Sequence, residues 1–261
     1  QALREGGVQV ATNSKVEEIT GKNGRVSAVK MEDGKEIECD LVIATIGYDP
    51  HTELAKAAGL ELNEHNAIRI DNYLRTSVKD VYAVGDCSGT HGFITGRTDN
   101  IMLASTATAK ARVLGYNLFN IGLLRNFYGT LSVFSTELNG KSFASAGAIE
   151  QSAKEANVDF VQGIFDDVDR HPGTLPDTST LKIKIIVSPE NGEIIGGELY
   201  GGKSVGEMIN TISLAIQKQV TVYELVSFQI GTHPLLTSAP TKYVLIKAAE
   251  NAISNIKKRH N

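Results

Sequence analysis

The sequence predicts a chain of mixed class, with an α/β part followed by an α+β part that contains an antiparallel sheet. Three observations lead to this prediction. Alternating apolar and polar residues with tight-turn dipeptides fill the first fifty residues, one amphipathic helix pattern lies near 100–120, and strands mix with helices after residue 128. We expect three parts, at 1–46, 47–122 and 123–261.

The first part is expected to be an antiparallel meander from residue 8 to residue 47. Asn23-Gly24 and Asp33-Gly34 separate its alternating runs, and these dipeptides are strong hairpin signals. The continuous apolar run 41–45 predicts a strand that is covered on both faces.

The chain opens with a pattern typical of the last turn of a helix, "QALRE", which Gly6-Gly7 would end. A chain seldom begins inside a helix, and Gln1 is not an initiator methionine. We therefore expect this sequence to be the C-terminal part of a longer protein.

The middle of the chain predicts a short helix within 50–62 and a short apolar strand at 81–84. A glycine-rich loop over 85–97 then leads into the helix near 100–120, and 121–127 is expected to be a linker.

The last part predicts strands on one face and helices on the other. Asn191-Gly192 marks a hairpin within 180–202. The other expected elements are strands within 130–140, 141–149 and 158–168, and helices at 150–157, 205–218, 221–227 and 239–255.

Composition narrows the classes of function. A net charge of −4 gives no reason to expect nucleic acid, and no apolar run approaches the ~18 residues of a membrane helix. Cys39 and Cys87 form no Cys-x-x-Cys pair, which fits a reducing cytoplasm, and the six histidines do not fall at metal-ligand spacing. We expect a cytoplasmic protein without a metal site.

Asp86 is the most informative single residue. It ends the run Val81–Val84 directly after Gly85, and an unpaired buried charge there would cost several kcal/mol. A carboxylate can accept two hydrogen bonds from a ligand with paired hydroxyls, and a glycine lets the backbone come close. The alternative is an ordinary capped turn. A ligand role requires that the carboxylate face a hollow and not be tied to neighbouring amides.

A second motif suggests a different chemistry. The stretch "GELYGGKS", residues 197–204, matches the phosphate-loop pattern, with Lys203 for the phosphates and Ser204 for Mg²⁺. The hairpin at Asn191-Gly192 favours another interpretation, in which residues 198–200 continue an antiparallel strand. A phosphate-loop nucleotidase is therefore the weaker alternative.

Several motifs resemble one family, in order along nearly the whole chain. "TSVKDVYAVGDCSG" is similar to the second flavin fingerprint of the pyridine nucleotide-disulfide oxidoreductases, and "LVIATIGYDPHTEL" resembles their crossing from the NAD to the FAD domain. "GTLSVFSTELNGKSFASAG" and "EIIGGELYGGKSVGEMINTISLAIQKQVTVYEL" resemble their dimerisation domain. The three parts would then be the last strands of an NAD-binding domain, the last segment of an FAD-binding domain and a dimerisation domain.

The resemblance implies roles for single residues. Asp86, after Gly85, would bind the ribityl hydroxyls of FAD, and Leu103 and Ala104 would offer backbone N–H groups to the N1/O2 edge of the flavin. Thr45 and Gly47 lie at the domain crossing, where a cofactor contact and an ordinary turn at a strand end are both open.

His233 lies in "GTHPLLTSAP", which is similar to the His-Pro of the disulfide-reductase branch. There a histidine reaches across the dimer as acid and base for the redox thiol. That branch also carries a glutamate five residues later, where this chain has Ser238, and the loop does not match the tyrosine and proline pattern of the oxidase branch either. A catalytic and a structural role for His233 both stay open, as does the branch.

The resemblance implies an enzyme that passes electrons from NAD(P)H through FAD to a disulfide, a thiol-linked acceptor or O₂. No G-x-G-x-x-G follows a strand in this sequence, so we expect this chain alone to hold neither cofactor completely and to be inactive. We expect a homodimer through the C-terminal domain, and an N-terminal half that supplies the rest. The alternatives are a non-catalytic assembly module and the nucleotidase.

Overall fold

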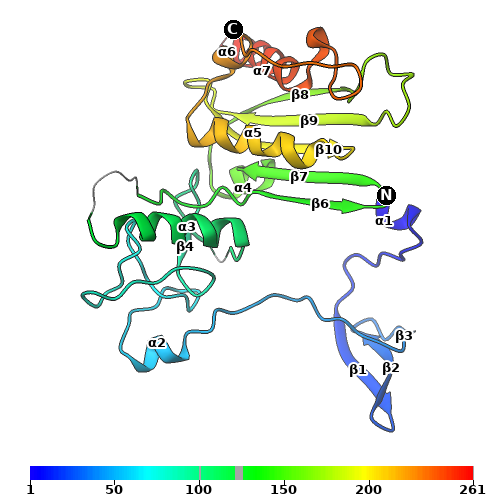
Figure 1. The fold of residues 1–261 in the computed structure, drawn as a ribbon. Helices are drawn as coiled ribbons and strands as arrows, with labels where there is room; N and C mark the ends of the chain where they lie inside the picture. The colour runs from blue at the N-terminus through cyan, green and yellow to red at the C-terminus, as the bar shows by residue number, and fades with distance from the viewer. Residues whose placement is uncertain (100, 121–125, 261) are drawn as a thin grey trace. The chain divides into compact units, whose positions relative to one another are not determined.

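The computed structural model describes residues 1–99, 101–120 and 126–260, and its helices and strands are labelled in Figure 1. The chain divides into two compact units, Gln1–Asp49 and Pro50–Asn261.

The first unit contains helix α1 (Ala2–Glu5) and a three-stranded antiparallel sheet in the order β1-β2-β3. The strands are β1 (Val16–Lys22), β2 (Arg25–Met31) and β3 (Glu36–Glu38). Asn23 and Gly24 have φ values of 53° and 75°, the left-handed conformation that a tight hairpin requires. The predicted meander, its two turns and the helix end before Gly7 are confirmed.

Two strand predictions in this unit are wrong. Residues 8–15 are irregular, so the meander starts at Val16 and not at Val8. The apolar run 41–45 is also irregular, and Ile43 is 77% exposed. A strand that is buried on both faces needs neighbours on either side, and no described segment pairs with the backbone of this run.

The second unit begins with helix α2 (Glu53–Ala57), as predicted within 50–62. The predicted strand at 81–84 is wrong: Tyr82 makes only an isolated bridge, to Arg75. A run of four apolar residues can be buried without a strand partner, as Ala83 is here. Two-residue strands β4 (Thr90–His91) and β5 (Thr98–Asp99) pair within the glycine-rich loop.

Helix α3 (Ala104–Asn117) confirms the helix predicted near 100–120, but its inner face differs from the expected apolar stripe. Its buried residues are Thr106, Lys110 and Asn117, all of them polar. Most of the predicted linker, 121–125, lies outside the described residues, and residues 126–127 are irregular.

A five-stranded antiparallel sheet forms the rest of the second unit, in the order β6-β7-β10-β9-β8. The predicted strands and the hairpin at Asn191-Gly192 are confirmed, and Gly192 has a φ of 77°. The elements are β6 (Phe134–Leu138), β7 (Lys141–Gly147), α4 (Glu150–Glu155), β8 (Val161–Val168), β9 (Thr180–Val187) and β10 (Ile194–Gly201).

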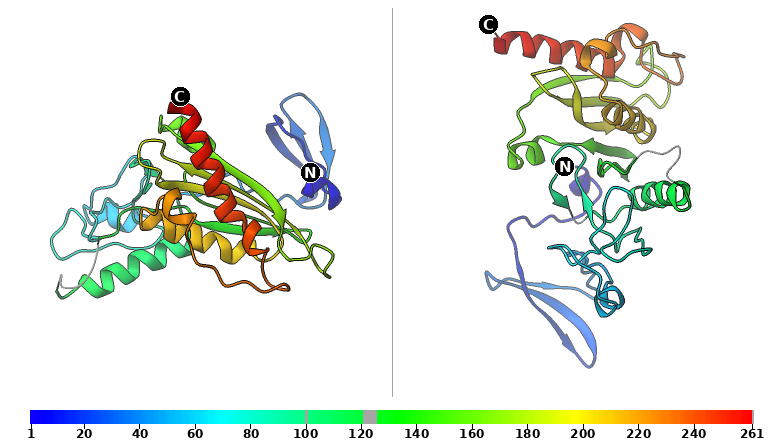
Figure 2. Two further views of the ribbon diagram at one scale, coloured as in Figure 1. Left: turned by 90° about the horizontal axis from the view of Figure 1, so that it is seen from above. Right: turned by 90° about the vertical axis from the view of Figure 1, so that its left-hand side faces the viewer.

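Helices α5 (Val205–Gln217), α6 (Val222–Leu225) and α7 (Val244–His260) complete the sheet domain. Helix α7 lies across the strands (Figure 2) and packs mainly on β8 and β9, while α5 packs on β10 and β7. The helix predicted from residue 239 begins only at Val244, because the 3₁₀ turn η1 (Pro240–Lys242) precedes it.

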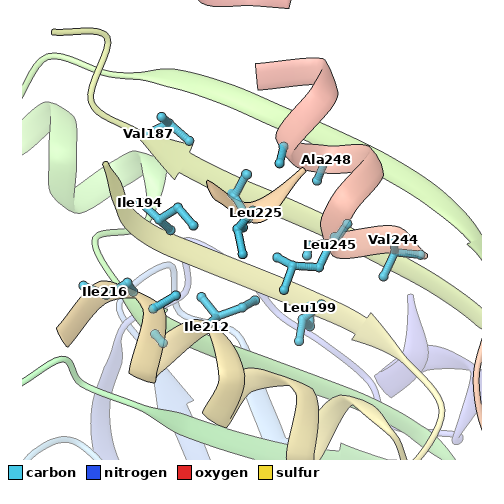
Figure 3. Close-up of a cluster of buried hydrophobic side chains, with 14 of the residues drawn as sticks. Val187, Ile194, Leu199, Ile212, Ile216, Leu225, Val244, Leu245 and Ala248 are labelled. Atoms are coloured by element: carbon cyan, nitrogen blue, oxygen red, sulfur yellow. The ribbon is translucent and has the colours of Figure 1, made fainter. Parts of the chain in front are cut away.

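The core lies between this sheet and its helices. Ile183 and Ile185 of β9, Leu199 of β10 and Ile212 of α5 are each at most 3% exposed. Figure 3 shows Val187, Ile194 and Leu199 directed toward the helices and meeting Ile212, Leu225 and Leu245. Alternate residues along β9 point into this cluster, as the alternating sequence pattern predicts.

The strand geometry excludes the phosphate loop. Glu198, Leu199 and Tyr200 lie within β10, which pairs antiparallel with both β9 and β7. A phosphate loop would need these residues curled around the phosphates after a parallel strand. The interpretation of "GELYGGKS" as a strand that leads into helix α5 is therefore confirmed.

Candidate functional site

The chain around Asp86 forms a tight turn. The amide of Ser88 donates to the carbonyl of Gly85 at 3.2 Å, which places Asp86 and Cys87 at the tip. Gly85 has a φ of 87°, a conformation that a residue with a Cβ adopts only at a cost. The glycine before the acid is therefore required by the backbone.

The carboxylate of Asp86 is free within the described part of the chain: it makes no hydrogen bond or ion pair there, and the residue is exposed. Asp71 shows what a turn-capping aspartate does in the same unit, because its Oδ1 accepts hydrogen bonds from the amides of Tyr73 (2.8 Å) and Arg75 (3.0 Å). Asp86 has no such role.

Of the two requirements for a ligand role, the structure meets one. Asp86 is not tied to neighbouring amides, but its side chain lies on an open surface. It does not line the cavity of about 410 Å³ that Gly89, Thr90 and His91 border.

The two backbone positions predicted to meet a flavin lie at the start of α3. Leu103 is the N-cap, with extended backbone, and Ala104 is the first helical residue. No side chain caps this end, and its first turn carries no acidic residue. The free N–H groups and the positive end of the helix dipole therefore favour an electron-rich partner.

Lys110 joins the turn to the helix, and sequence reasoning missed it. Its side chain projects from α3 and is 1% exposed. Its Nζ donates to the carbonyls of Ser88 and Gly89 and to the hydroxyl of Ser88, each at 3.0 Å, and also to the hydroxyl of Thr90 in β4 (Figure 1). The spacing of Thr106, Lys110 and Asn117 places them on one face of the helix. Because a polar helix face normally points to water, nothing in the sequence indicated that Lys110 would be buried.

Burial lowers the pKa of Lys110 to about 8, while the charges of Cys87 and Asp86 act in the opposite direction. The Phe127 ring centroid lies 5.8 Å from Nζ, so an aromatic face contributes to holding the cation. A strongly shifted lysine beside a free carboxylate is the kind of electrostatic feature that occurs often at functional sites.

Thr45 and Gly47 belong to the first unit and lie in irregular, exposed chain. Gly47 has a φ of 130°, which favours glycine. The other predicted contacts belong to the second unit.

His233 is exposed in the loop between α6 and η1. Its Nδ1 accepts a hydrogen bond from the amide of Leu235 at 3.2 Å, so Nε2 carries the proton in the neutral ring. Ser238, at the position of the family's glutamate, is 4% exposed and donates to the carbonyl of Val168 at 2.6 Å. The ring is thus oriented by its own loop and not by residue 238.

Two further properties concern metal and membrane. Among the described residues, no three His, Cys, Asp or Glu side chains gather as ligands for a metal ion. Within the same ranges, every helix is too short or too polar to cross a bilayer.

Comparisons with known proteins show the family to which the chain belongs. Residues 1–111 match the family described as pyridine nucleotide-disulphide oxidoreductase, and residues 139–244 match the dimerisation domain of the same family. The chain belongs to the pyridine nucleotide-disulphide oxidoreductases. Members of this family use FAD and NAD(H), and the chain contains their dimerisation domain.

The individual relatives have different names. An NADH oxidase of Methanocaldococcus jannaschii is 30% identical over 97% of this chain and 55% of its own length. A dihydrolipoyl dehydrogenase of Mycobacterium leprae is 28% identical over 89% of this chain and 48% of its own length. The solved NAD-dependent persulfide reductase of A. fulgidus superposes with a TM-score of 0.87 at 32% identity, over 99% of this chain and 46% of its own. The chain spans about half the length of the curated relatives it matches.

Proposed function

We propose that this chain is the C-terminal part of an FAD- and NAD(P)H-dependent oxidoreductase that passes electrons to a disulfide, a thiol-linked acceptor or O₂. In this proposal residues 1–46 end the NAD-binding domain, 47–122 end the FAD-binding domain and 123–261 form the dimerisation domain. FAD, when bound, would take up hydride from NAD(P)H and release the electrons to the acceptor.

The observation that carries the proposal is the free carboxylate of Asp86. It lies at the tip of a turn that Gly85 permits, and that turn is bonded through Lys110 to helix α3. Ala104, where α3 begins, lies six residues before Lys110, which corresponds to about 9 Å along a helix axis. A ligand that reached both would present hydroxyls to the acid and an electron-rich edge to the helix end.

The residues present fit this role. Asp86 would accept hydrogen bonds from two ribityl hydroxyls, and the amides of Leu103 and Ala104 would face the N1/O2 edge of the flavin. Thr45 and Gly47 would contribute at the domain crossing. The open surface around Asp86 is what a site completed by a preceding part of the protein would present.

His233 is proposed as the acid and base of the second half-reaction, in which electrons leave the flavin. The Nε2 edge could exchange a proton with a thiol of the other subunit of a homodimer. Leu235 orients the ring in place of the family's glutamate. His233→Gln in the complete protein should lower kcat with acceptor and leave flavin content unchanged.

Titration with FAD tests the proposal. We expect the 261-residue chain alone to bind no stoichiometric FAD and to show no NAD(P)H oxidation. With the polypeptide encoded before Gln1 supplied, we expect a yellow, flavin-loaded homodimer. In that complex Asp86→Asn should weaken FAD binding about 10- to 100-fold, because charge-assisted hydrogen bonds contribute about 1.5–3 kcal/mol.

Asp80→Asn is a matched control. Asp80 is exposed and has a φ of 62°, a conformation that asparagine also tolerates, so this change should leave FAD binding intact. Full flavin occupancy of the 261-residue chain alone would contradict the division of the site between two parts. An FAD-free dimer that only recruits another nucleotide-binding polypeptide would favour an assembly module.

A further inference from the structure

A buried ammonium lies directly beneath the exposed turn of Asp86. Lys110 is 1% exposed, yet none of its hydrogen-bond acceptors is a carboxylate: they are two carbonyls and two hydroxyls of Ser88, Gly89 and Thr90. Burying a charge without a counter-ion is expensive, so a core-packing role alone would favour an apolar residue here.

The hydrogen bonds continue from the ammonium to the turn. Nζ of Lys110 donates to Oγ of Ser88 at 3.0 Å, and that hydroxyl donates to the carbonyl of Gly85 at 2.8 Å. The Gly85 carbonyl belongs to the peptide group whose nitrogen is that of Asp86. Two bonds therefore connect the lysine to the backbone that aims the acid.

Backbone hydrogen bonds to Ile68 also hold the segment 87–89. Ile68 donates to the carbonyl of Cys87 at 2.8 Å and accepts from the amide of Gly89 at 2.8 Å. The segment 87–89 is thus held by Ile68 along its backbone and by Lys110 from helix α3. Only Asp86, at the tip, is left free to meet a ligand within the described chain.

We propose that Lys110 is a positioning residue for the flavin: through Ser88 it fixes the Gly85–Asp86 turn relative to helix α3, so that the acid and the helix end meet the cofactor together. This inference rests on the proposed FAD site. The titratable groups that face the ammonium are Asp86 and Cys87 of the loop, and the other groups against it are hydroxyls, carbonyls and the ring of Phe127. The lowered pKa is consistent with a charge kept there for function.

Hydrogen exchange on the 261-residue chain is the first test, because it needs no flavin. Lys110→Met keeps an unbranched side chain, one atom shorter, and removes every donor. We expect the amides of Ser88 and Gly89 to lose at least about tenfold in protection, since buried acceptors are left unpaired. The amides of β9 and β10 should keep their protection from exchange. Arg112→Met removes an exposed cation from the same helix. It should leave the protection of the loop amides and of the strand amides unchanged.

FAD binding in the complete protein is the second test. Lys110→Met and Ser88→Ala should each weaken FAD binding about tenfold or more, and the double variant should be no weaker than Lys110→Met alone. Such non-additive losses would show that Lys110 and Ser88 act through one chain of hydrogen bonds. The losses in FAD binding from two independent structural defects would instead add. The circular dichroism of bound flavin should shift in both single variants, because the ribityl chain meets a displaced acid.

The outcomes separate the two proposals. If the wild-type complex binds no FAD, the proposed function fails and this inference fails with it. If Asp86→Asn weakens FAD but Lys110→Met and Ser88→Ala do not, the proposed function stands and the role of Lys110 is wrong. Additive losses of FAD binding in the Lys110 and Ser88 variants would also contradict the positioning role of Lys110. So would unchanged hydrogen-exchange protection of Ser88 and Gly89 in Lys110→Met.

Discussion

Two regions of the second unit are stabilised in different ways. The five-stranded sheet and helices α5 and α7 enclose aliphatic side chains such as Ile185 and Ile212. Helix α3 instead buries Thr106, Lys110 and Asn117, and neither polar atom of the Asn117 side chain finds a partner in the described structure. The sheet domain is organised for stability, whereas the loop region retains polar groups that cost stability. Such costs are expected where a ligand must be held.

The largest expected effect concerns the apolar region. Ile212 of α5 is fully buried, so Ile212→Ala should lower the free energy of unfolding by about 2–5 kcal/mol through lost burial and a cavity. Leu214→Ala, on the same helix at a residue that is 56% exposed, should cost much less. Denaturant titration followed by circular dichroism measures both. Equal losses would break the distinction between the inner and outer faces of α5.

The next effect concerns pH and the polar region. Burial lowers the pKa of Lys110 to about 8 in the folded chain, against about 10.4 for an unfolded lysine. Between these values the unfolded chain binds more protons, so this group makes the free energy of unfolding rise with pH. From pH 7 to pH 9 the rise should be about 1 kcal/mol.

The Lys110 contribution is isolated by difference. Wild type and Arg112→Met should share this rise with pH, and Lys110→Met should lack it. Denaturant titrations at pH 7, 8 and 9 measure the slope. A slope that survives in Lys110→Met would show that the buried ammonium is not its source.

A polar contact of the sheet domain should have a smaller and local effect. Thr221 caps α6: its Oγ1 accepts from the amide of Glu224 at 3.2 Å, and Glu224 accepts from the amide of Thr221 at 2.7 Å. Thr221→Ala should cost about 1 kcal/mol. The amide and the hydroxyl of Thr221 both donate to the Glu224 carboxylate and lower its pKa, so the part of the cost that comes from losing the hydroxyl should shrink in acid as that carboxyl is protonated. Thermal unfolding at pH 7 and pH 3 compares the two conditions.

The smallest expected effect on stability comes from an exposed ion pair. Arg259 and Asp159 form a two-point ion pair at 2.7 and 2.8 Å, but both side chains are exposed. Asp159→Asn should change the free energy of unfolding by only about 0.2–1 kcal/mol, and less in high salt. A larger effect than that of the pH change at Lys110 would mean that charge, and not burial, distinguishes the two regions.

Local patterns were sufficient for the elements that depend on neighbouring residues. The hairpins at Asn23-Gly24 and Asn191-Gly192 follow from turn chemistry, and β10 follows from its hairpin with β9. The family was also readable from motifs. The run 41–45 failed as a strand because an apolar run becomes a strand only beside a partner, and the run 81–84 pairs with its neighbour only through the isolated bridge of Tyr82 to Arg75.

The sequence by itself determined the class of protein, the order of its elements and the glycine before Asp86. Only the tertiary structure decided that Asp86 has no partner among the described residues while Asp71 caps its own turn, and that Lys110 is buried beneath the turn of Asp86. The physical reason is distance along the chain. Turns and caps form within a few residues, whereas Lys110 meets Ser88 from 22 residues away, through packing that no local pattern encodes.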